Sequence, residues 1–249
     1  MTFRAESMPF FKGQRPRVFA HRGLHTSAPE NSLGAFRAAV SAGVDYIETD
    51  IVASRDGYAM VSHDLVLDRV AGIAAPVNSL SAAELANVDL GGEGFITLEH
   101  ALTAFPTTRF NIDVKDASAI DGLVRAVTAT DAFDRVLVSS FSTARRRSAL
   151  RRLPAVATSA TAAEFLRIYA SARLGATPMI SDLHAVQIPA RIGALRTVTP
   201  ALINRYHRAG VEVHVWTVND PKDMRELLDM GVDGIVTDRA DLALDVIQS

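Results

Sequence analysis

The sequence contains no cysteine among its 249 residues, which excludes disulfides, zinc–thiolate sites and a thiol nucleophile. It also lacks any run of roughly 18 apolar residues, so we expect no membrane-spanning helix. The net charge is only −2, which gives no reason to expect nucleic acid or an anionic membrane surface as the main partner. With 48% apolar and 22% charged residues, the composition is that of an ordinary globular protein, and we expect a cytoplasmic location.

The chain is predicted to hold one domain of the α/β class. Residues 1–16 lack the continuous apolar core of a signal peptide, so we expect an irregular lead-in there and a single domain over residues 17–249. Short β-branched runs then alternate with longer Ala- and Leu-rich stretches, as in a parallel βα fold. Strands are predicted at 17–20, 46–51, 109–114, 135–139, 155–158, 185–188, 212–217 and 234–237. Helices are predicted at 31–42, 119–130, 162–174, 200–209, 221–229 and 241–247. This pattern favours a (β/α)8 TIM barrel, with a doubly wound open sheet as the alternative.

An internal echo supports the barrel. Residues 43–50 and 231–238 both run from Gly-Val-Asp through a strand to Thr-Asp. The glycine fits a left-handed helix stop, and the final Asp is expected to cap the next element.

Residues 54–95 break the alternation of strands and helices. Asp56-Gly57 predicts a turn, and residues 58–61 predict a short returning strand. We expect an insertion after the second strand that carries His63 back over the barrel mouth, with a short helix near 79–86 capped by Ser79 or Ser81.

Carboxylates gather at the predicted carboxyl ends of two strands. Alternation places Glu48 and Asp50 on one face of the second strand, and Asp113 and Lys115 on one face of the third. Three carboxylates that converge inside a barrel would suit one divalent cation, Mg²⁺ or Ca²⁺, which takes oxygen ligands. The alternative is that Glu48, Asp50 and Asp113 form salt bridges with Lys115 and Arg22.

Two histidines stand at predicted strand or hairpin ends beside polar clusters. Cleavage of a phosphodiester needs a base for the nucleophile and an acid for the leaving oxygen, and histidine titrates near neutrality. His21 and His63 are therefore the candidate pair. The other five histidines are interpreted as structural: His25, His100, His184, His207 and His214.

Further residues suit a phosphate ester. Arg22 offers a planar fork to phosphate oxygens and Lys115 a point charge. Glu30 is expected to hold Arg22, and Asn31 to line the site and cap the first helix. Trp216 is expected to form an apolar wall for the alcohol part of the substrate, with core packing as the alternative. The arginine run at 145–147 is interpreted as a solvated helix face.

Taken in order over residues 18–240, these clusters resemble the glycerophosphodiester phosphodiesterase family. The motifs that carry the resemblance are His21-Arg22-Gly23, Pro29-Glu30-Asn31-Ser32, Glu48-Thr49-Asp50, Arg55-Asp56-Gly57, Val61-Ser62-His63-Asp64, Thr97-Leu98-Glu99, Asn111-Ile112-Asp113-Val114-Lys115, Val215-Trp216-Thr217-Val218-Asn219 and Asp233-Gly234-Ile235-Val236-Thr237-Asp238.

The resemblance implies a (β/α)8 barrel with an insertion after the second strand and a role in lipid metabolism. It implies a divalent ion on Glu48, Asp50 and Asp113, and His21 and His63 as the acid/base pair. The glycerol 2-hydroxyl would attack phosphorus, an alcohol would leave, and water would open the cyclic phosphate to give glycerol 3-phosphate. Asp113 departs from the glutamate that is usual in the family, which can alter the preference for the metal ion. The sequence does not decide between Mg²⁺ and Ca²⁺, and it does not identify the released alcohol.

Three rival interpretations remain. The phospholipase D toxin-like branch shares the barrel and its two histidines, but those enzymes are secreted and stapled by disulfides, which this chain cannot form. A Schiff-base lyase that uses Lys115 would leave His63 and Glu48 unexplained. A barrel that only binds phosphoesters would be expected to have lost a histidine or a ligand, and none is missing.

Overall fold

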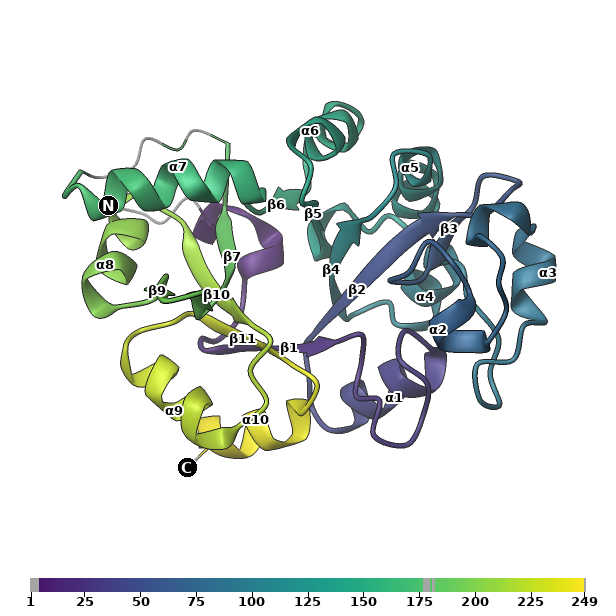
Figure 1. The fold of residues 1–249 in the computed structure, drawn as a ribbon, viewed down its shortest axis with the longest axis horizontal. Coiled ribbons are helices and arrows are strands. Elements are labelled where there is room, and N and C mark those ends of the chain that lie inside the picture. The colour runs from purple at the N-terminus through teal and green to yellow at the C-terminus, as the bar shows by residue number, and fades with distance from the viewer. Residues whose placement is uncertain (1–4, 177–179, 181, 249) are drawn as a thin grey trace.

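Eight short, mostly apolar runs form a parallel barrel in the computed structural model, which describes residues 5–176, 180 and 182–248 (Figure 1). In sheet order these strands are β6 (Ala157–Thr158), β5 (Val136–Ser139), β4 (Arg109–Val114), β2 (Tyr46–Ala53), β1 (Arg17–His21), β11 (Gly234–Thr237), β10 (Glu212–Trp216) and β7 (Ala185–Pro189). Backbone hydrogen bonds from Ala160 N to Ala185 O (2.9 Å) and from His184 N to Thr158 O (3.0 Å) join β6 to β7. The predicted TIM barrel, rather than the open sheet, is therefore confirmed.

Helices cover the outside of the barrel (Figure 1). They are α1 (Leu33–Ser41), α4 (Leu98–Ala104), α5 (Ala119–Ala129), α6 (Thr143–Arg152), α7 (Ala162–Arg173), α8 (Pro200–Arg208), α9 (Pro221–Asp229) and α10 (Ala240–Gln248). Hydroxyl side chains before several of them accept a backbone N–H of the first turn, as Thr97 and Thr199 do. Gly43 and Gly231 follow α1 and α9 with φ of 99° and 96°, so the helix stops predicted from the echo are confirmed. No helix of the described residues is long and apolar enough to cross a bilayer.

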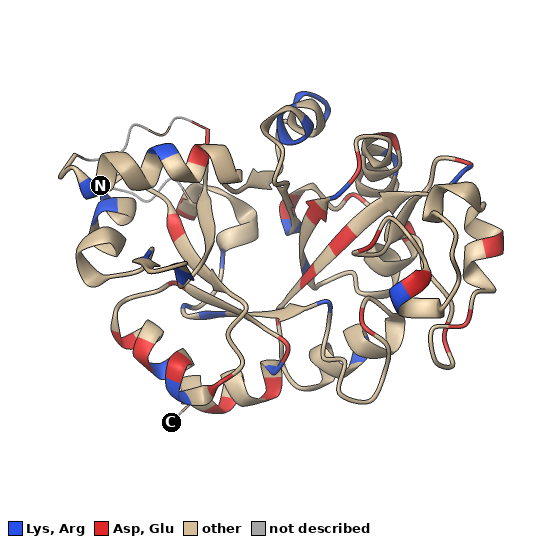
Figure 2. Cartoon of the chain, viewed as in Figure 1, with Lys and Arg blue, Asp and Glu red and all other residues tan. Residues whose placement is uncertain are grey.

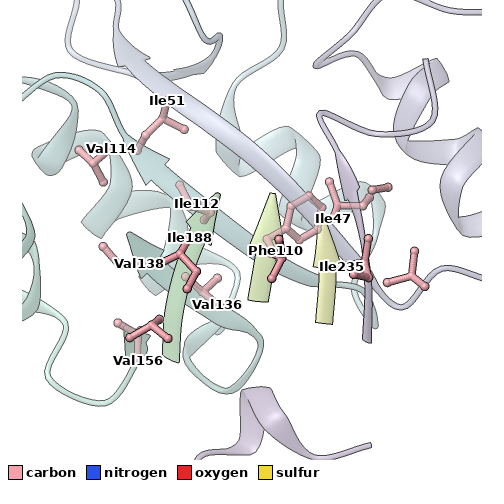
Figure 3. Packing of buried hydrophobic residues seen from close by; sticks show 14 of the residues in the cluster. Ile47, Ile51, Phe110, Ile112, Val114, Val136, Val138, Val156, Ile188 and Ile235 are labelled. Carbon is pink, nitrogen blue, oxygen red and sulfur yellow. The ribbon is translucent and has the colours of Figure 1, made fainter. Parts of the chain in front are cut away.

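Towards their carboxyl ends, the strands separate an apolar outer face from a polar inner one. Ile47 and Ile51 of β2 and Ile112 and Val114 of β4 belong to the main core, which includes the inner sides of the helices (Figure 3). The residues that alternate with them along each strand, such as Asp50 and Asp113, point into the barrel, as expected from the two-residue period of a strand. Polar side chains can therefore stand inside the barrel without interrupting the core that holds it together.

The N-terminal segment closes the amino end of the barrel. Residues 1–4 of the predicted lead-in lie outside the described residues, and the expectation of an irregular segment is corrected for Ala5–Ser7 (η1) and Pro9–Phe11 (η2), which form 3-10 turns. Phe10 and Phe11 are buried against interior residues of the strands such as Phe19. The apolar pair was the signal for this packing, because two adjacent phenylalanines are rarely left in water.

Residues 54–95 form a small unit on the outside of β2. They contain β3 (Ala59–Val61), which pairs antiparallel with β2, then α2 (Asp68–Ala71), η3 (Val77–Ser79) and α3 (Ala82–Ala86). Ser81 caps α3 through a capping box, one of the two caps expected. A separate apolar cluster, which includes Met60 and Leu85, holds this unit together. A short hairpin, β8 (Arg191–Ile192) and β9 (Leu195–Arg196), follows β7 and was not predicted.

Candidate active site

A cavity of about 500 Å³ opens at the carboxyl ends of the strands. Strand register brings charged residues together there, because His21 on β1 pairs with Glu48 on β2, and Asp50 on β2 pairs with Asp113 on β4. Figure 2 shows acidic positions in red along β2 and β4. Eight of the predicted site residues line this cavity: His21, Arg22, Glu48, Asp50, His63, Asp113, Lys115 and Trp216.

The remaining two predicted site residues, Glu30 and Asn31, lie beside it. They line a smaller cavity of about 190 Å³, and His63 borders both. Asn31 is not the cap of the first helix, because Ser32 accepts the hydrogen bond from Ala35 N. Asn31 instead has a left-handed backbone with φ of 57° and turns its side chain inward, where Nδ2 lies 3.4 Å from Asp50 Oδ2. The predicted cap is thus wrong by one residue, and the predicted contact with the site is present.

The carboxylates crowd around Lys115. Its Nζ lies 2.8 Å from Asp50 Oδ1 and 2.7 Å from Asp113 Oδ2, and Arg22 Nε lies 3.4 Å from Asp50 Oδ2. These are the salt bridges of the alternative interpretation. Glu48 has no comparable cation: burial raises its pKa well above the usual value, and repulsion from Asp50 and Asp113 raises it further. Burial also raises the pKa of Asp113.

Buried oxygen atoms without hydrogen bonds are suited to binding a divalent cation. Glu48 Oε2, Asp113 Oδ1 and Asn111 Oδ1 are buried and accept no hydrogen bond from the residues that the structure describes. Burying such atoms unpaired is costly, and a hard divalent cation takes ligands of this kind. In the described part of the chain, however, no group of three or more His, Cys, Asp or Glu side chains is assembled as a metal site. The predicted ligand set therefore stays a prediction, supported by the orphaned oxygens.

His21 is held by a carboxylate on a distant strand end. Its Nδ1 lies 2.7 Å from Asp238 Oδ1, and its Nε2 lies 3.9 Å from Glu48 Oε2. Asn219 donates to the other oxygen of Asp238 at 2.7 Å. Hydrogen bonds from His21 first, then from His25, hold the pKa of Asp238 far below its usual value. An ionised Asp238 accepts the Nδ1 proton of a neutral His21, which leaves Nε2 free to accept a proton.

His63 has a similar arrangement within the 54–95 unit. Its Nδ1 lies 2.7 Å from Asp64 Oδ1, and Asp64 Oδ2 accepts from Arg69 at 2.6 Å. Arg69 also contacts Glu30 at 2.6 Å, and Glu30 contacts Arg22 at 3.1 Å, as the sequence predicted for that pair. This chain of ion pairs links the unit that carries His63 to the arginine of the main site.

Lys115 is unsuited to Schiff-base chemistry in this setting. Although burial acts in the opposite direction, the Asp50 and Asp113 carboxylates raise the pKa of Lys115. A Schiff-base lysine needs a lowered pKa in order to be a nucleophile. The lyase alternative therefore has no support from the geometry.

Sequence reasoning missed several residues of the site. His25, interpreted as structural, lies beside His21, and its Nε2 is 3.2 Å from Asp238 Oδ1. Asp238 was expected to cap a helix and instead holds two histidines. Phe141 also lines the cavity, with its ring 6.2 Å from that of Trp216 and edge-on to it. The motif that contains Asp238 was the available signal for that residue, although only a capping role was assigned to it.

Two other interpretations of charged or titratable residues have different outcomes. Arg146 is fully buried and contacts Glu164 at 2.7 Å, so the solvated-face interpretation of 145–147 is wrong for its central residue. Arg146 can be buried because Glu164, on the next helix, accepts its hydrogen bond. The structural interpretation is confirmed for His207 and His214, which contact Asp233 at 2.7 Å and Glu212 at 3.1 Å.

Comparison with known proteins agrees with this geometry. The glycerophosphoryl diester phosphodiesterase family matches residues 21–242. The chain is similar to the probable glycerophosphodiester phosphodiesterase 2 of Mycobacterium tuberculosis, with 43% identity over 98% of this chain and 95% of that protein. Among solved structures, it is similar to the glycerophosphodiester phosphodiesterase of Agrobacterium tumefaciens, with 27% identity, a TM-score of 0.75 and coverage of 94% of this chain and 99% of that one.

A further solved structure supports the fold alone. A phosphodiesterase of Oleispira antarctica, in complex with the product sn-glycerol-3-phosphate, has a TM-score of 0.79 at 23% identity, over 94% of this chain and 98% of that one. Because the family match spans most of the sequence and the 43% identical relative spans nearly all of it, the chain belongs to the glycerophosphoryl diester phosphodiesterase family, and it is a hydrolase of that class.

Proposed function

We propose that the chain hydrolyses glycerophosphodiesters to glycerol 3-phosphate and an alcohol, with one divalent cation, Mg²⁺ or Ca²⁺, and two-histidine acid/base catalysis. The observation that carries the proposal is the pair of buried, unpaired oxygens, Glu48 Oε2 and Asp113 Oδ1, beside a histidine whose Nδ1 is held by Asp238. Glu48, Asp50 and Asp113 would hold the cation. When bound, it would neutralise charge that develops on the phosphate oxygens.

The protein's own groups account for the proton transfers. His21 Nε2 takes the proton of the glycerol 2-hydroxyl, whose oxygen then attacks phosphorus. His63 gives a proton to the oxygen of the departing alcohol, and a five-membered cyclic phosphate remains. In the second half, His63 takes a proton from water, which opens the ring, and His21 returns its proton to the 2-oxygen. Arg22 and Lys115 hold the phosphate by charge.

A metal titration tests the proposal most directly. The protein is stripped with EDTA and assayed on glycerophosphocholine, glycerophosphoethanolamine and glycerophosphoinositol, with Mg²⁺ or Ca²⁺ added back singly. We expect turnover to vanish and then return, and full activity after exhaustive chelation would contradict the cation. If none of the three diesters is hydrolysed with either metal ion, the result would instead favour a barrel that only binds phosphoesters.

Calorimetry of metal binding gives a readout apart from turnover. Asp113→Asn should weaken binding because it removes a charge, whereas Asp113→Glu should retain it and can shift the preference between the two ions. Asp116→Asn is the matched control, since the Asp116 side chain is hydrogen-bonded to nearby Ser118 and does not line the cavity formed by the described residues. Unchanged affinity in Asp113→Asn would remove that residue from the ligand set. A cytoplasmic location and a role in lipid metabolism are part of the same proposal, and cell fractionation tests the location.

A further inference from the structure

The charged residues of the cavity gather on one side, and its large apolar side chains gather on the other. His21, Glu48 and Asp113 come from β1, β2 and β4, on one side of the barrel. The opposite side is lined by six apolar residues, here called the apolar wall: Phe141, Phe165, Leu166, Ile188, Ile192 and Trp216. Among the described residues, the others that line the cavity on that side are small or uncharged, such as Ser159 and Gln187. A cavity divided in this way is complementary to an amphiphilic ligand.

Half of the apolar wall stands in solvent. Phe141 is 60% exposed, Leu166 57% and Ile192 44%. These side chains come from separate elements, the loop after β5, helix α7 and the β8–β9 hairpin, yet they border one cavity. Single exposed apolar residues are ordinary, but several that border one reaction site mark a place that a ligand can cover.

We propose that the apolar wall binds a hydrocarbon chain carried by the glycerophosphodiester, so that the preferred substrates are amphiphilic, lysophospholipid-like diesters. The inference rests on the proposed function, because the diester at the charged half fixes which molecule extends to the wall. Because the charged residues and the apolar wall line the same cavity, the wall is better suited to a chain attached to the reacting phosphodiester than to a separate ligand.

A cationic head group such as choline is the rival occupant, since aromatic rings bind quaternary ammonium groups. The geometry disfavours it. The Lys115 ammonium already stands 5.6 Å from the centre of the Phe141 ring, so a second cation there would be repelled. The wall also offers no carboxylate to balance the added charge. A neutral hydrocarbon meets neither obstacle.

The test is a chain-length series below the critical micelle concentration. The first arm compares glycerophosphocholine with its 1-hexanoyl and 1-decanoyl derivatives, and the second uses glycerol phosphodiesters of hexanol and decanol. The arms tell whether the chain is carried by the glycerol or by the leaving alcohol. Full burial of a methylene corresponds to a factor of about four, so the four extra methylenes should raise kcat/KM at least about tenfold on this half-open wall. A change of less than twofold in both arms would overturn the inference.

Matched leucines on one helix supply the control. Leu166 of α7 lines the cavity, whereas Leu174, the C-cap of the same helix, is 88% exposed and does not line it. Leu166→Ser should reduce the decanoyl-to-hexanoyl ratio of kcat/KM at least threefold, mainly through KM, and Phe141→Ser should act in the same way. Leu174→Ser should leave the ratio unchanged. Equal effects of the two leucine variants would contradict a specific subsite.

Binding of a product analogue separates this inference from the proposed function. Trp216 is the single tryptophan of the chain and belongs to the wall, so its fluorescence reports on occupancy without turnover. 1-Decanoyl lysophosphatidic acid should bind at least about tenfold more tightly than glycerol 3-phosphate and shift the emission to the blue. Chain-dependent binding without any hydrolysis would refute the proposed function and keep the subsite. Hydrolysis of every diester with equal binding of the two ligands would refute the subsite alone.

Discussion

We predict that Asp238 determines which nitrogen of His21 carries the proton, and Asp238→Asn tests that role. Asp238 Oδ1 faces His21 Nδ1 at 2.7 Å, and Asp238 Oδ2 accepts from Asn219 Nδ2, also at 2.7 Å. The orientation of the Asn219 amide is fixed, because its Oδ1 accepts from Asp238 N at 2.9 Å and from the Thr237 hydroxyl at 3.0 Å. The NH2 group of Asn219 must therefore point at Asp238.

This arrangement decides how the new amide would turn. Its oxygen should stay toward the Asn219 NH2, so its own NH2 would face His21 and donate to Nδ1. The imidazole proton would then move to Nε2, and the ring could no longer accept a proton there. Loss of a general base lowers kcat by about 10²–10⁴-fold. Weakening one hydrogen bond by about 1.5 kcal/mol would cost only about tenfold, so the two explanations are separable.

The assay compares kcat on glycerophosphocholine for the wild type, Asp238→Asn and the double variant Asn219→Asp with Asp238→Asn. In the double variant the carboxylate at 219 can accept from the new NH2, which turns the amide oxygen back to His21 Nδ1. We expect at least about tenfold recovery over the single variant, within the 10²–10⁴-fold range of a general base. A single variant within tenfold of wild type, or a double variant no better than the single one, would refute the tautomer argument. Thermal melting checks that each variant is folded.

Three further predictions concern the histidine pair, the nucleophile and the buried ion pair. His21→Ala and His63→Ala should each lower kcat by at least about 10²-fold on the natural diester. A nitrophenyl ester, whose leaving group needs no proton, should rescue His63→Ala but not His21→Ala; the reverse pattern would exchange their roles. A glycerophosphodiester without the 2-hydroxyl should bind and turn over far more slowly, and equal rates would indicate direct attack by water. Glu212→Gln should lower the free energy of unfolding by about 3–5 kcal/mol in urea titrations, because it leaves Arg17 buried without its carboxylate. Against the effect of burial, hydrogen bonds from His214 and Arg17 lower the pKa of Glu212 to about 2, so the stability from this pair is complete above the unfolded value near 4.5 and is lost as the pH falls through 2.

The strands of the barrel and their charged inner positions could both be predicted from the same feature, the alternation of apolar and polar residues along each strand. On β4 the outward residues Phe110 and Ile112 are apolar and the inward Asp113 is charged, so the period of two gives the strand and the orientation together. The observed bounds of β4 and β11 coincide with the predicted ones, at Arg109–Val114 and Gly234–Thr237. The glycines that end α1 and α9 were predictable for a similar local reason, since only the backbone conformation is involved.

Contacts that depend on barrel closure were beyond the sequence pattern. His21 and Asp238 are 217 positions apart and meet only because β1 and β11 are neighbours in the closed sheet. Arg146 was misinterpreted for a related reason: its acceptor, Glu164, lies on another helix and is invisible in a local charge run. The sequence pattern predicts which face of a strand or helix carries such a side chain. Which residue it contacts depends on how the strands and helices are arranged in the fold.

Trp216 was predicted to form an apolar wall, but the exposed part of that wall was missed because exposed apolar side chains carry no signal in the sequence. A leucine on a helix surface such as Leu166 is indistinguishable by pattern from Leu174, and most exposed leucines have no function. Only the common cavity separates the two, since Leu166 borders the space that His21 and Asp113 enter from the other side. His21, Glu48 and Asp113 stand on strands, whereas Phe141, Leu166 and Ile192 stand on a loop, a helix surface and a short hairpin. Substitutions in these three elements can change the size of the alcohol or acyl group without moving the strand positions that carry the chemistry, so the chain-length series should separate members of the family that share the same charged residues.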